Sequence, residues 1–529
     1  MKINNKLPRI SLFVATFVLL SAPIGISIGH LIQDPDTANA AFEALSISPD
    51  KGSVIGGEEV TITGVDLDEA EEVEIVQLAA GTGHNLALSS KGKIYAWGSN
   101  VSGQLGNGTN DSSSTPVEVD MSGVMKGKDI VAIETRYNNS FALDSDGKLY
   151  GWGNNVNGIL GNGSTDHTNL PVAVDTSGVL NGKKIVQVAS SQNHTIVLDD
   201  EGQIYAWGSN NAGRMGPGAI YSTVPVKIQQ TGNLLEGKEI ILVEAGYWHS
   251  YAVDSNSNIY AWGWNDNGQL GDGVTGAGGS YAPVQVVNTG VLSGKSIVQI
   301  SAGKDFTMVL DTDGRTYGWG YNAAGQIGNG EGGTGVKTSV PVATDNSGVL
   351  KNISLTQISA GWYHTMALGS DNQIYLWGYD YYGQMGDDEI RAHQYYPTTP
   401  DTTGVLKDKT FIQVESGIYH SMALDYEGKV YAWGYNYAGQ IADGTTTDAY
   451  LPTGPVDFSA FAIEPEISVT IDGLECTNVT IISSDTITCI TPAHISGTVD
   501  VVVGNGRTES ILPSSYTYVD VGVPNTGAK

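Results

Sequence analysis

Residues 95–106 read Tyr-Ala-Trp-Gly-Ser-Asn-Val-Ser-Gly-Gln-Leu-Gly, and the Trp-Gly pair of this stretch returns six more times along the chain. Successive tryptophans of these pairs are 55, 55, 55, 57, 58 and 56 residues apart, and they are Trp97, Trp152, Trp207, Trp262, Trp319, Trp377 and Trp433. A near-constant interval of this length indicates a repeat architecture with one structural unit per interval. The sequence therefore predicts seven units.

Each unit contains four short apolar runs that are separated by turn residues. In the first unit they are residues 76–81, 85–88 and 94–97, followed by a run that begins at Pro116. The proline recurs in the other units, at Pro171, Pro225, Pro283, Pro341, Pro397 and Pro452. Four short strands are the content of one propeller blade. We therefore predict an all-β fold in which residues 75–458 form a seven-bladed β-propeller, and we expect the seven large tryptophan side chains to fill the gaps between neighbouring sheets.

Two further groups of β-branched runs flank the repeats. Residues 43–68 contain two alternating runs around the Gly56-Gly57 turn, and residues 463–519 contain several short runs with turn residues between them. These patterns are typical of a small β-sandwich. We predict that both segments form one immunoglobulin-like sandwich, which the propeller interrupts between its second and third strands. A closed ring can be inserted in this way because its two ends lie close together.

The charge of the chain restricts its partners. It carries 26 basic and 56 acidic residues, a net charge of −30. A surface of this sign repels nucleic acid and anionic lipid, so we expect no nucleic-acid partner. The two cysteines, Cys476 and Cys489, allow at most one internal disulfide, and two free buried thiols are the alternative.

The first 40 residues are typical of a signal peptide. Basic residues at positions 2, 6 and 9 precede an apolar run over residues 10–32, and Ala38-Asn39-Ala40 supplies the small residues that signal peptidase requires. An uncleaved membrane anchor is the alternative, since the apolar run is long enough to span a bilayer. In either case we expect the rest of the chain to be extracellular, secreted or attached to the cell wall.

Five histidines recur at one repeat position, immediately before the second apolar run: His84, His194, His249, His364 and His420. Equivalent positions lie far apart around a ring, so a hydrogen bond that fixes a turn within each blade explains the repetition better than a ring of metal ligands. Asp254-Ser-Asn-Ser-Asn258 begins like a calcium loop but lacks the glycine and the late glutamate of such a loop. The glycine-rich residues 328–333 do not open a helix, as a nucleotide site requires. We therefore predict no metal, no cofactor and no catalytic residues, and we leave weak calcium binding open.

The positions that the repeat leaves variable become aromatic in the later units. They are the pair before the histidine position and the residues just after Trp-Gly, and in units one to three they are mostly small or polar. Equivalent turns share one face of a ring, so we expect an aromatic arc on half of one face, where Tyr and Trp would bury a large area at little entropic cost. The predicted partner-binding residues are Tyr247, Trp248, Trp264, Tyr321, Trp362, Tyr363, Tyr379, Tyr381, Tyr382, Tyr419, Tyr435 and Tyr437. The alternative is that these tyrosines only cap the ends of the blades.

The repeated motif Ala-Gly-x-x-His, Ala-Leu, Trp-Gly-x-Asn-x-x-Gly-Gln-Leu-Gly resembles the regulator of chromosome condensation repeat family over about 380 residues. Departures are local, such as Asp388 and Ala442 where glycine is expected. The resemblance implies a seven-bladed propeller. The nuclear exchange-factor branch of the family reads chromatin with basic elements, whereas this chain is acidic and carries an export signal, so we expect no GTPase partner. Secreted members include an inhibitor that clamps its target enzyme with one face of the ring.

The two flanking segments resemble one IPT/TIG domain, through Ser-Pro-x-x-Gly at residues 48–52, the Gly56-Gly57 pair and Cys-x-x-Pro at residues 489–492. This resemblance implies a bridge between Cys476 and Cys489 on neighbouring strands, which an oxidising compartment would allow. Val-Pro-Asn-Thr-Gly at residues 523–527 resembles the sorting signal that sortases cut between Thr and Gly, here Thr526 and Gly527. Only two residues follow where a full signal continues, so we interpret residues 520–529 as a truncated signal, with a chance match as the alternative.

Together these features predict an exported binding protein that docks an extracellular protein or a cell-wall glycan on an aromatic propeller face and has no catalytic activity. Sortase would be a further partner if the full sorting signal exists. A secreted inhibitor of an extracellular enzyme is the first alternative. A propeller lyase or hydrolase is the second, and carboxylates converging on the central channel would favour it.

Overall fold

The structure is a computed structural model that describes residues 43–65, 72–218, 221–276, 278–390, 392–462, 467–504 and 509–520. One compact unit contains residues 74–457, and the described residues before and after them form a second unit. The expected signal peptide and the expected sortase cleavage position at Thr526 and Gly527 lie outside the described residues. In the described part of the chain, no helix is both long enough and apolar enough to cross a membrane.

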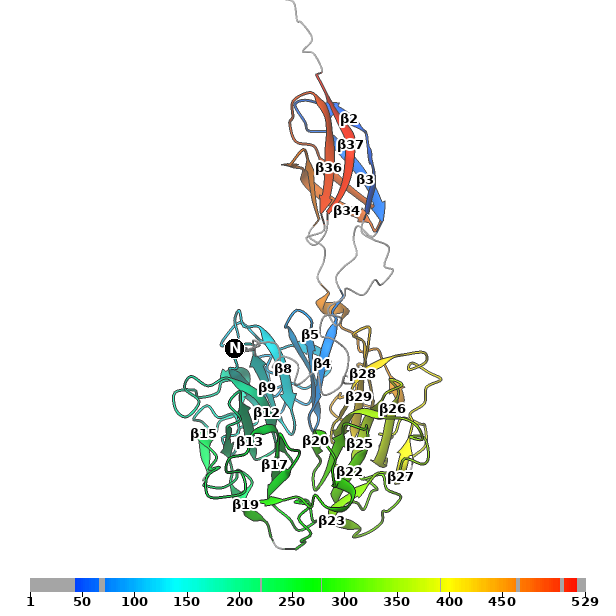
Figure 1. Cartoon of the computed structure of the whole chain (residues 1–529). Coiled ribbons are helices and arrows are strands. Elements are labelled where there is room, and N and C mark those ends of the chain that lie inside the picture. The colour runs from blue at the N-terminus through cyan, green and yellow to red at the C-terminus, as the bar shows by residue number, and fades with distance from the viewer. Residues whose placement is uncertain are drawn as a thin grey trace, which may run out of the picture. The chain divides into compact units, whose positions relative to one another are not determined.

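The described residues of the first unit contain seven sheets, each of four consecutive antiparallel strands (Figure 1). The first strands of the sheets are β4 (Ile75–Ala80), β8 (Ile130–Thr135), β12 (Ile185–Ser190), β16 (Ile240–Ala245), β20 (Ile297–Ala302), β24 (Leu355–Ala360) and β28 (Phe411–Ser416). The second strands are β5 (His84–Ser89), β9 (Asn139–Asp144), β13 (His194–Asp199), β17 (His249–Asp254), β21 (Phe306–Asp311), β25 (His364–Gly369) and β29 (His420–Asp425). The third strands are β6 (Ile94–Gly98), β10 (Leu149–Gly153), β14 (Ile204–Gly208), β18 (Ile259–Gly263), β22 (Thr316–Tyr321), β26 (Ile374–Tyr379) and β30 (Val430–Gly434). The fourth strands are β7 (Ser113–Glu118), β11 (Thr168–Ala173), β15 (Ser222–Lys227), β19 (Ser280–Gln285), β23 (Lys337–Ala343), β27 (His393–Thr398) and β31 (Ala449–Thr453). Two short 3-10 helices, η3 (Asn211–Gly213) and η4 (Gly290–Leu292), lie in loops that connect strands.

Burial differs between the strands of a sheet. In the first sheet β5 and β6 are buried along their whole length, whereas β7 is mostly exposed or half-buried. The middle strands are covered on both faces by neighbouring sheets, which explains why apolar residues such as Leu86, Ala87 and Leu88 follow one another without polar alternation. The fourth strand is the outer edge of the sheet, and its proline, Pro116 in the first unit, removes a backbone donor there. Pro116 itself is buried, but a missing donor on an edge strand still opposes pairing with another chain.

The repeated tryptophans are fully buried and bond to the preceding sheet. Trp152 Nε1 donates to the carbonyl oxygen of Gln104 at 2.9 Å. A Cβ at Gly106, two residues later in the same turn, would lie 2.7 Å from the Trp152 indole, and Gly106 has a φ of +65°. The indole and the backbone conformation therefore both require glycine at this turn.

The first and last sheets of the described residues contact each other, since β4 packs against β28 and β29 (Figure 1). Trp97 Nε1 and Asn85 Nδ2 both donate to the carbonyl oxygen of Gln440, at 2.9 and 2.8 Å. This is the arrangement that joins Trp152 to Gln104, so the sheets close into a ring with the same contact at the seam.

The second unit is a sandwich of two sheets that contain strands from both ends of the chain. The four-stranded sheet has the order β1 (Glu43–Ser48), β3 (Glu59–Val65), β35 (Thr486–Ile490), β34 (Thr477–Ser483). The five-stranded sheet has the order β2 (Lys51–Ser53), β37 (Glu509–Val519), β36 (Gly497–Gly504), β32 (Ser468–Ile471), β33 (Leu474–Glu475), and η5 (Ser459–Phe461) precedes β32. The repeats follow the third strand, so the prediction of an insertion after the second strand is wrong. The short β2 has no apolar alternation that would reveal it in the sequence.

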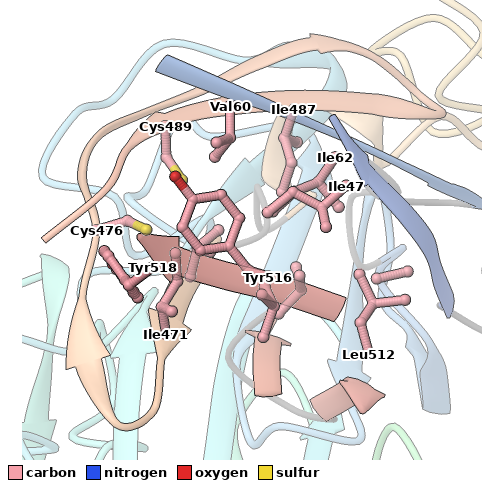
Figure 2. Packing of buried hydrophobic residues seen from close by; sticks show 14 residues of the cluster. Ile47, Val60, Ile62, Ile471, Cys476, Ile487, Cys489, Leu512, Tyr516 and Tyr518 are labelled. Carbon is pink, nitrogen blue, oxygen red and sulfur yellow. The ribbon is translucent and has the colours of Figure 1, made fainter. Parts of the chain in front are cut away.

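The sandwich core packs aliphatic and tyrosine side chains of both segments, among them Ile62, Ile487 and Tyr516 (Figure 2). Cys476 and Cys489 lie in this core as free buried thiols, so the structure contradicts the expected disulfide. The backbone N–H of Cys476 donates to Val469 of β32 at 2.8 Å, which ties Cys476 to the five-stranded sheet, whereas Cys489 belongs to β35 of the other sheet. The two thiols share a hydrogen bond, and this bond together with burial raises the pKa of the Cys476 thiol.

Candidate functional site

The first strands line a cavity of about 150 Å³ on the axis of the ring, and glutamines tie these strands together. Gln77 Nε2 donates to the Ile133 carbonyl of the next sheet at 3.1 Å, and Gln77 Oε1 accepts from the Ile133 N–H at 3.0 Å. Gln413 binds Leu78 of the first sheet in the same way, at 2.9 and 2.8 Å. A strand at a sheet edge needs partners for its backbone groups, and these side chains supply them across the gap between sheets.

Three glutamates, Glu134, Glu244 and Glu415, line the same cavity, where Arg136 Nη2 lies 3.8 Å from Glu244 Oε1. Burial raises the pKa of Glu134 to about 8 and that of Glu415 to about 7, while the positive charge of Arg136 opposes both shifts. Glu244 Oε1 accepts the N–H of Ala302 in the next sheet at 3.1 Å. Its own strand carries leucine at the glutamine position, so the glutamate provides the link between sheets there. Carboxylates therefore do converge on the axis, as the enzyme alternative requires.

The recurrent histidines are fully buried and bond to the next sheet. His84 Nε2 lies 2.8 Å from Thr135 Oγ1 and 2.9 Å from Ser140 Oγ, and His194 Nε2 lies 2.6 Å from Ser250 Oγ. The expectation of a hydrogen bond within one blade holds for His194, whose Nδ1 lies 2.8 Å from Ser191 Oγ in the turn of its own sheet, but the His84 ring bonds only to the neighbouring sheet. Burial is the main cause that lowers the pKa to about 3 for His84, His249, His364 and His420.

The loop that begins like a calcium site uses its carboxylate within the protein. Asp254 Oδ1 accepts the backbone N–H groups of Asn256 and Asn258 at 3.0 and 2.9 Å, and Oδ2 accepts the Tyr260 hydroxyl at 3.0 Å. Across the described ranges, no group of three or more His, Cys, Asp or Glu side chains is arranged to hold a metal ion.

The two faces of the ring differ in chemistry. Because the strands are antiparallel, the turn between the first and second strands and the connection after the third strand lie on one face, and the remaining turns lie on the other. The other face carries ion pairs such as Lys295–Asp313 and Lys409–Glu427, at 2.9 and 2.7 Å. The aromatic residues predicted from the repeat belong to the first face.

A continuous run of rings crosses that face. The ring centroids of Tyr437 and Tyr435 are 6.4 Å apart, those of Tyr435 and Tyr382 4.8 Å, and those of Tyr382 and Tyr419 5.1 Å. The run continues from Tyr419 to Trp362 at 6.4 Å, from Trp362 to Tyr247 at 5.5 Å, and from Tyr247 to Trp248 at 4.8 Å. We name these rings and the others in contact with them the aromatic band, which comprises Tyr137, Tyr247, Trp248, Trp362, Tyr363, Tyr379, Tyr381, Tyr382, Tyr419, Tyr435 and Tyr437.

Two predicted residues do not join these ring contacts among the described residues. Trp264 is partly buried and lies outside the band. Tyr321 also lies outside it, although it is near enough to Tyr363 and Lys304 for both to influence its pKa, which burial raises.

Two cations lie against the band: Arg214 Cζ is 4.2 Å from the Trp248 ring centroid, and Lys304 lies against three other rings. Lys304 Nζ is 4.9 Å from the Trp362 ring centroid, 5.1 Å from that of Tyr363 and 6.0 Å from that of Tyr247. The ammonium also donates to the Tyr363 hydroxyl at 2.6 Å. A cation at such distances is attracted to the negative faces of the rings, which keeps Lys304 in place.

Comparisons with known proteins show which protein families the chain resembles. The RCC1-like domain family matches residues 50–287, and the regulator of chromosome condensation (RCC1) repeat matches residues 313–368 and 371–424. The ultraviolet-B receptor UVR8 of Arabidopsis thaliana is 30% identical over 381 residues, which cover 72% of this chain and 81% of the receptor. The chain belongs to the RCC1 repeat family. The IPT/TIG domain family matches residues 460–519.

Further known proteins are similar to this chain over part of their length or in fold alone. The E3 ubiquitin-protein ligase HERC2 of Homo sapiens is 29% identical over 372 residues, and the chain spans only 7% of that protein. The crystal structure of human WBSCR16 aligns with a TM-score of 0.59 at 20% identity, over 76% of this chain and 99% of the other. Prp20p of Saccharomyces cerevisiae aligns with a TM-score of 0.58 at 19% identity, over 80% of this chain and 93% of the other.

The RCC1 register also accounts for the band residue that the sequence prediction missed. Tyr137 occupies the first of the two positions before the histidine position, as Tyr247 and Trp362 do. It lies in a unit whose other variable positions are asparagines, so that unit taken by itself does not indicate an aromatic surface. Reading that single position across all units would have found it.

Proposed function

We propose that this RCC1-repeat protein is an exported, non-catalytic binding protein whose seven-bladed propeller docks a protein partner through the aromatic band. The observation that carries the proposal is the continuity of the band across one face. Its outer rings are open to solvent, with Tyr437 77% and Tyr381 57% exposed. Tyrosine and tryptophan supply much of the binding energy of protein interfaces because they bury large areas at low entropic cost.

Relatives support protein binding as the general use of this fold. The structure of yeast Prp20p was described together with its binding properties to Gsp1p and histones, and Prp20 was solved bound to Kap60. We propose a different partner for this chain, and its net charge of −30 and its N-terminal export pattern support that proposal. The absence of a GTPase partner, the extracellular location and the attachment to the cell wall are parts of the same proposal.

The three glutamates on the ring axis do not favour an enzymatic function over a binding function. Their cavity measures about 150 Å³, and the space lined by Tyr137, Tyr247 and Trp362 towards the aromatic face measures about 20 Å³. Ligand pockets for small molecules usually hold about 300 Å³ or more. The glutamate positions also serve to link neighbouring first strands, which accounts for carboxylates on the axis without catalysis.

The docking proposal predicts the outcome of a capture experiment with the full chain as bait. We expect the double variant Tyr381→Ala/Tyr437→Ala to lose an extracellular partner that the unchanged chain retains, by at least tenfold, because two exposed rings leave the contact surface. The matched control is Tyr426→Ala, a tyrosine that is 63% exposed in a hairpin on the opposite face. Equal capture by all three chains would show that the aromatic band does not dock a partner.

A further inference from the structure

Lys304 differs from several lysines on the opposite face of the ring, each of which pairs with a carboxylate. Lys183 Nζ lies 2.5 Å from Glu201 Oε2, and Lys295 Nζ lies 3.2 Å from Asp311 Oδ2. In the described residues, no Asp or Glu oxygen lies within ion-pair distance of Lys304 Nζ, although acidic residues outnumber basic ones 56 to 26 in the chain. Among the described residues, this cation of the aromatic band therefore has no ion-pair partner, although the protein is strongly acidic.

The nearest carboxylate belongs to the next residue and is engaged elsewhere. Asp305 Oδ1 accepts a hydrogen bond from Gln269 Nε2 at 3.2 Å. Burial lowers the pKa of Lys304. The hydrogen bond to the Tyr363 hydroxyl and the nearby charge of Asp305 raise it, and the net effect is a raised pKa. Lys304 is therefore charged at neutral pH and is held by one phenol and by ring faces.

The ammonium of Lys304 has three N–H donors, and among the described residues only the Tyr363 hydroxyl accepts a hydrogen bond from it. When a partner covers the band, water leaves these rings and the ammonium loses solvent contacts as well. An ammonium that is desolvated without an anion weakens binding, whereas a carboxylate placed beside it forms a strong charge-assisted hydrogen bond in a dry surrounding. Charged pairs that are fully desolvated at the centre of an interface are the ones that decide affinity and specificity.

We propose that Lys304, with Trp362, Tyr247 and Tyr363 around it, forms a carboxylate subsite that receives an Asp or Glu side chain of the docked protein. This inference rests on the proposed function, since it names the chemistry that the partner presents to the aromatic band. The chain as a whole repels acidic proteins at long range. We therefore expect a single carboxylate flanked by apolar side chains, not an acidic segment.

The test selects twelve-residue random peptides displayed on phage against the immobilised full chain and keeps those that fail to bind Tyr381→Ala/Tyr437→Ala. Selected peptides are synthesised with their acidic residue intact and with Glu→Gln or Asp→Asn, and their affinities are measured for the unchanged chain, Lys304→Met and Lys304→Arg. Methionine keeps the apolar stem on the rings and removes the charge, and arginine keeps the charge. Lys93→Met is the matched control, because Lys93 pairs with Glu118 away from the band.

The expected result is that band-dependent peptides contain an acidic residue and bind Lys304→Met at least tenfold more weakly, with Lys304→Arg close to the unchanged chain. The Glu→Gln or Asp→Asn change in the peptide should weaken its binding to the unchanged chain by a similar factor. The same peptide change should have little effect on binding to Lys304→Met, because the carboxylate and Lys304 then contribute through one shared interaction. Band-dependent peptides that bind Lys304→Met as well as the unchanged chain would overturn the carboxylate subsite and leave docking intact. If no peptide depends on the band while an uncharged oligosaccharide such as cellohexaose does, the partner is a glycan and both the subsite and the protein-docking proposal fail.

Discussion

The last residue of the Gly-Gln-Leu-Gly turn has no room for a side chain. A Cβ at Gly161, Gly271 or Gly386 would lie 2.8 Å from the indole of the next sheet. The seventh sheet breaks this rule with Ala442, whose φ of 61° is in the left-handed region. Ala442 is 5% exposed and stands next to the seam where Trp97 bonds to Gln440. The seam between the last and first sheets therefore carries local strain that the other junctions avoid.

We expect Ala442→Gly to stabilise the propeller by about 1 kcal/mol, since glycine relieves an unfavourable backbone conformation and this gain exceeds the entropy that glycine adds to the unfolded chain. Urea unfolding followed by tryptophan fluorescence measures the change. All ten tryptophans lie between residues 97 and 433, so the signal reports the propeller and not the sandwich. The matched variant Gly106→Ala should destabilise by about 2–4 kcal/mol, because it adds the left-handed cost and a clash with Trp152. Destabilisation by both changes would mean that Ala442 is not strained.

The residues that carry local chemistry could be read from the sequence only in part. The seven tryptophans were predicted to fill the gaps between sheets because a large side chain recurred at one repeat position. The partners of the His84 side chain could not be read from the sequence, since they lie more than 50 residues ahead, in the next unit. Cys476 and Cys489 lie near one another as expected, but nothing in their spacing distinguishes a bridge from two thiols that share a hydrogen bond.

At the scale of strands, apolar runs located most elements. The run at residues 94–97 corresponds to β6 (Ile94–Gly98), and the run at residues 85–88 lies within β5. The glutamine hydrogen bonds that link the first strands of neighbouring sheets cannot be recognised from an apolar run. Gln299 bonds to both backbone groups of Ile358, with its Oε1 and Nε2 each at 2.8 Å from its partner. A buried glutamine at one strand position is interpretable only once the neighbouring strand is known to present an unpaired edge.

We expect Gln299→Leu to destabilise the propeller by about 1–3 kcal/mol, because the N–H and carbonyl of Ile358 lose their partners in a buried place. Leucine is close to glutamine in size, so little of the effect should come from packing. The exposed Gln285→Leu, at the outer edge strand β19, is the control and should change stability by less than about 0.5 kcal/mol. Urea unfolding with tryptophan fluorescence again gives the comparison. Equal effects of the two changes would show that the glutamine links between sheets contribute little.

At the scale of the whole molecule, ring closure is what assembles the aromatic band. The repeat predicted that equivalent turns share one face, and that was sufficient to place most of the aromatic residues together. It did not predict that Tyr137 and Trp362, from distant units, would stack at 6.2 Å with their planes 14° apart. That contact depends on the narrowness of the ring at its axis, which no local pattern encodes.

The buried ionisable groups of the whole ring predict how its stability depends on pH. Histidines whose pKa is lowered to about 3 in the folded state are protonated first in the unfolded chain, so their contribution to stability is lost as pH falls below about 6.5. Glu134 and Glu415 have the opposite sign. Their pKa values of about 8 and 7 exceed the ordinary value, so the folded state holds protons that the unfolded chain has released, and stability falls as pH rises from about 4.5 towards 8.

These opposing contributions place the stability maximum near pH 6.5. Between about pH 4.5 and 6.5 the histidines outnumber the axial glutamates, so stability should rise with pH, and above 6.5 only the glutamates still change protonation. Each group alters the unfolding free energy by about 1.4 kcal/mol per pH unit while one state alone holds its proton. We expect urea unfolding at pH 5.0, 6.5 and 8.0 to show this maximum, and Glu134→Gln to reduce the loss between pH 6.5 and 8.0 and to steepen the rise between pH 5.0 and 6.5, because Glu134 opposes the histidines there. An unaltered slope above pH 6.5 in Glu134→Gln would mean that the axial carboxylates are already ionised in the folded ring, where Arg136 and water in the cavity would then have to stabilise them.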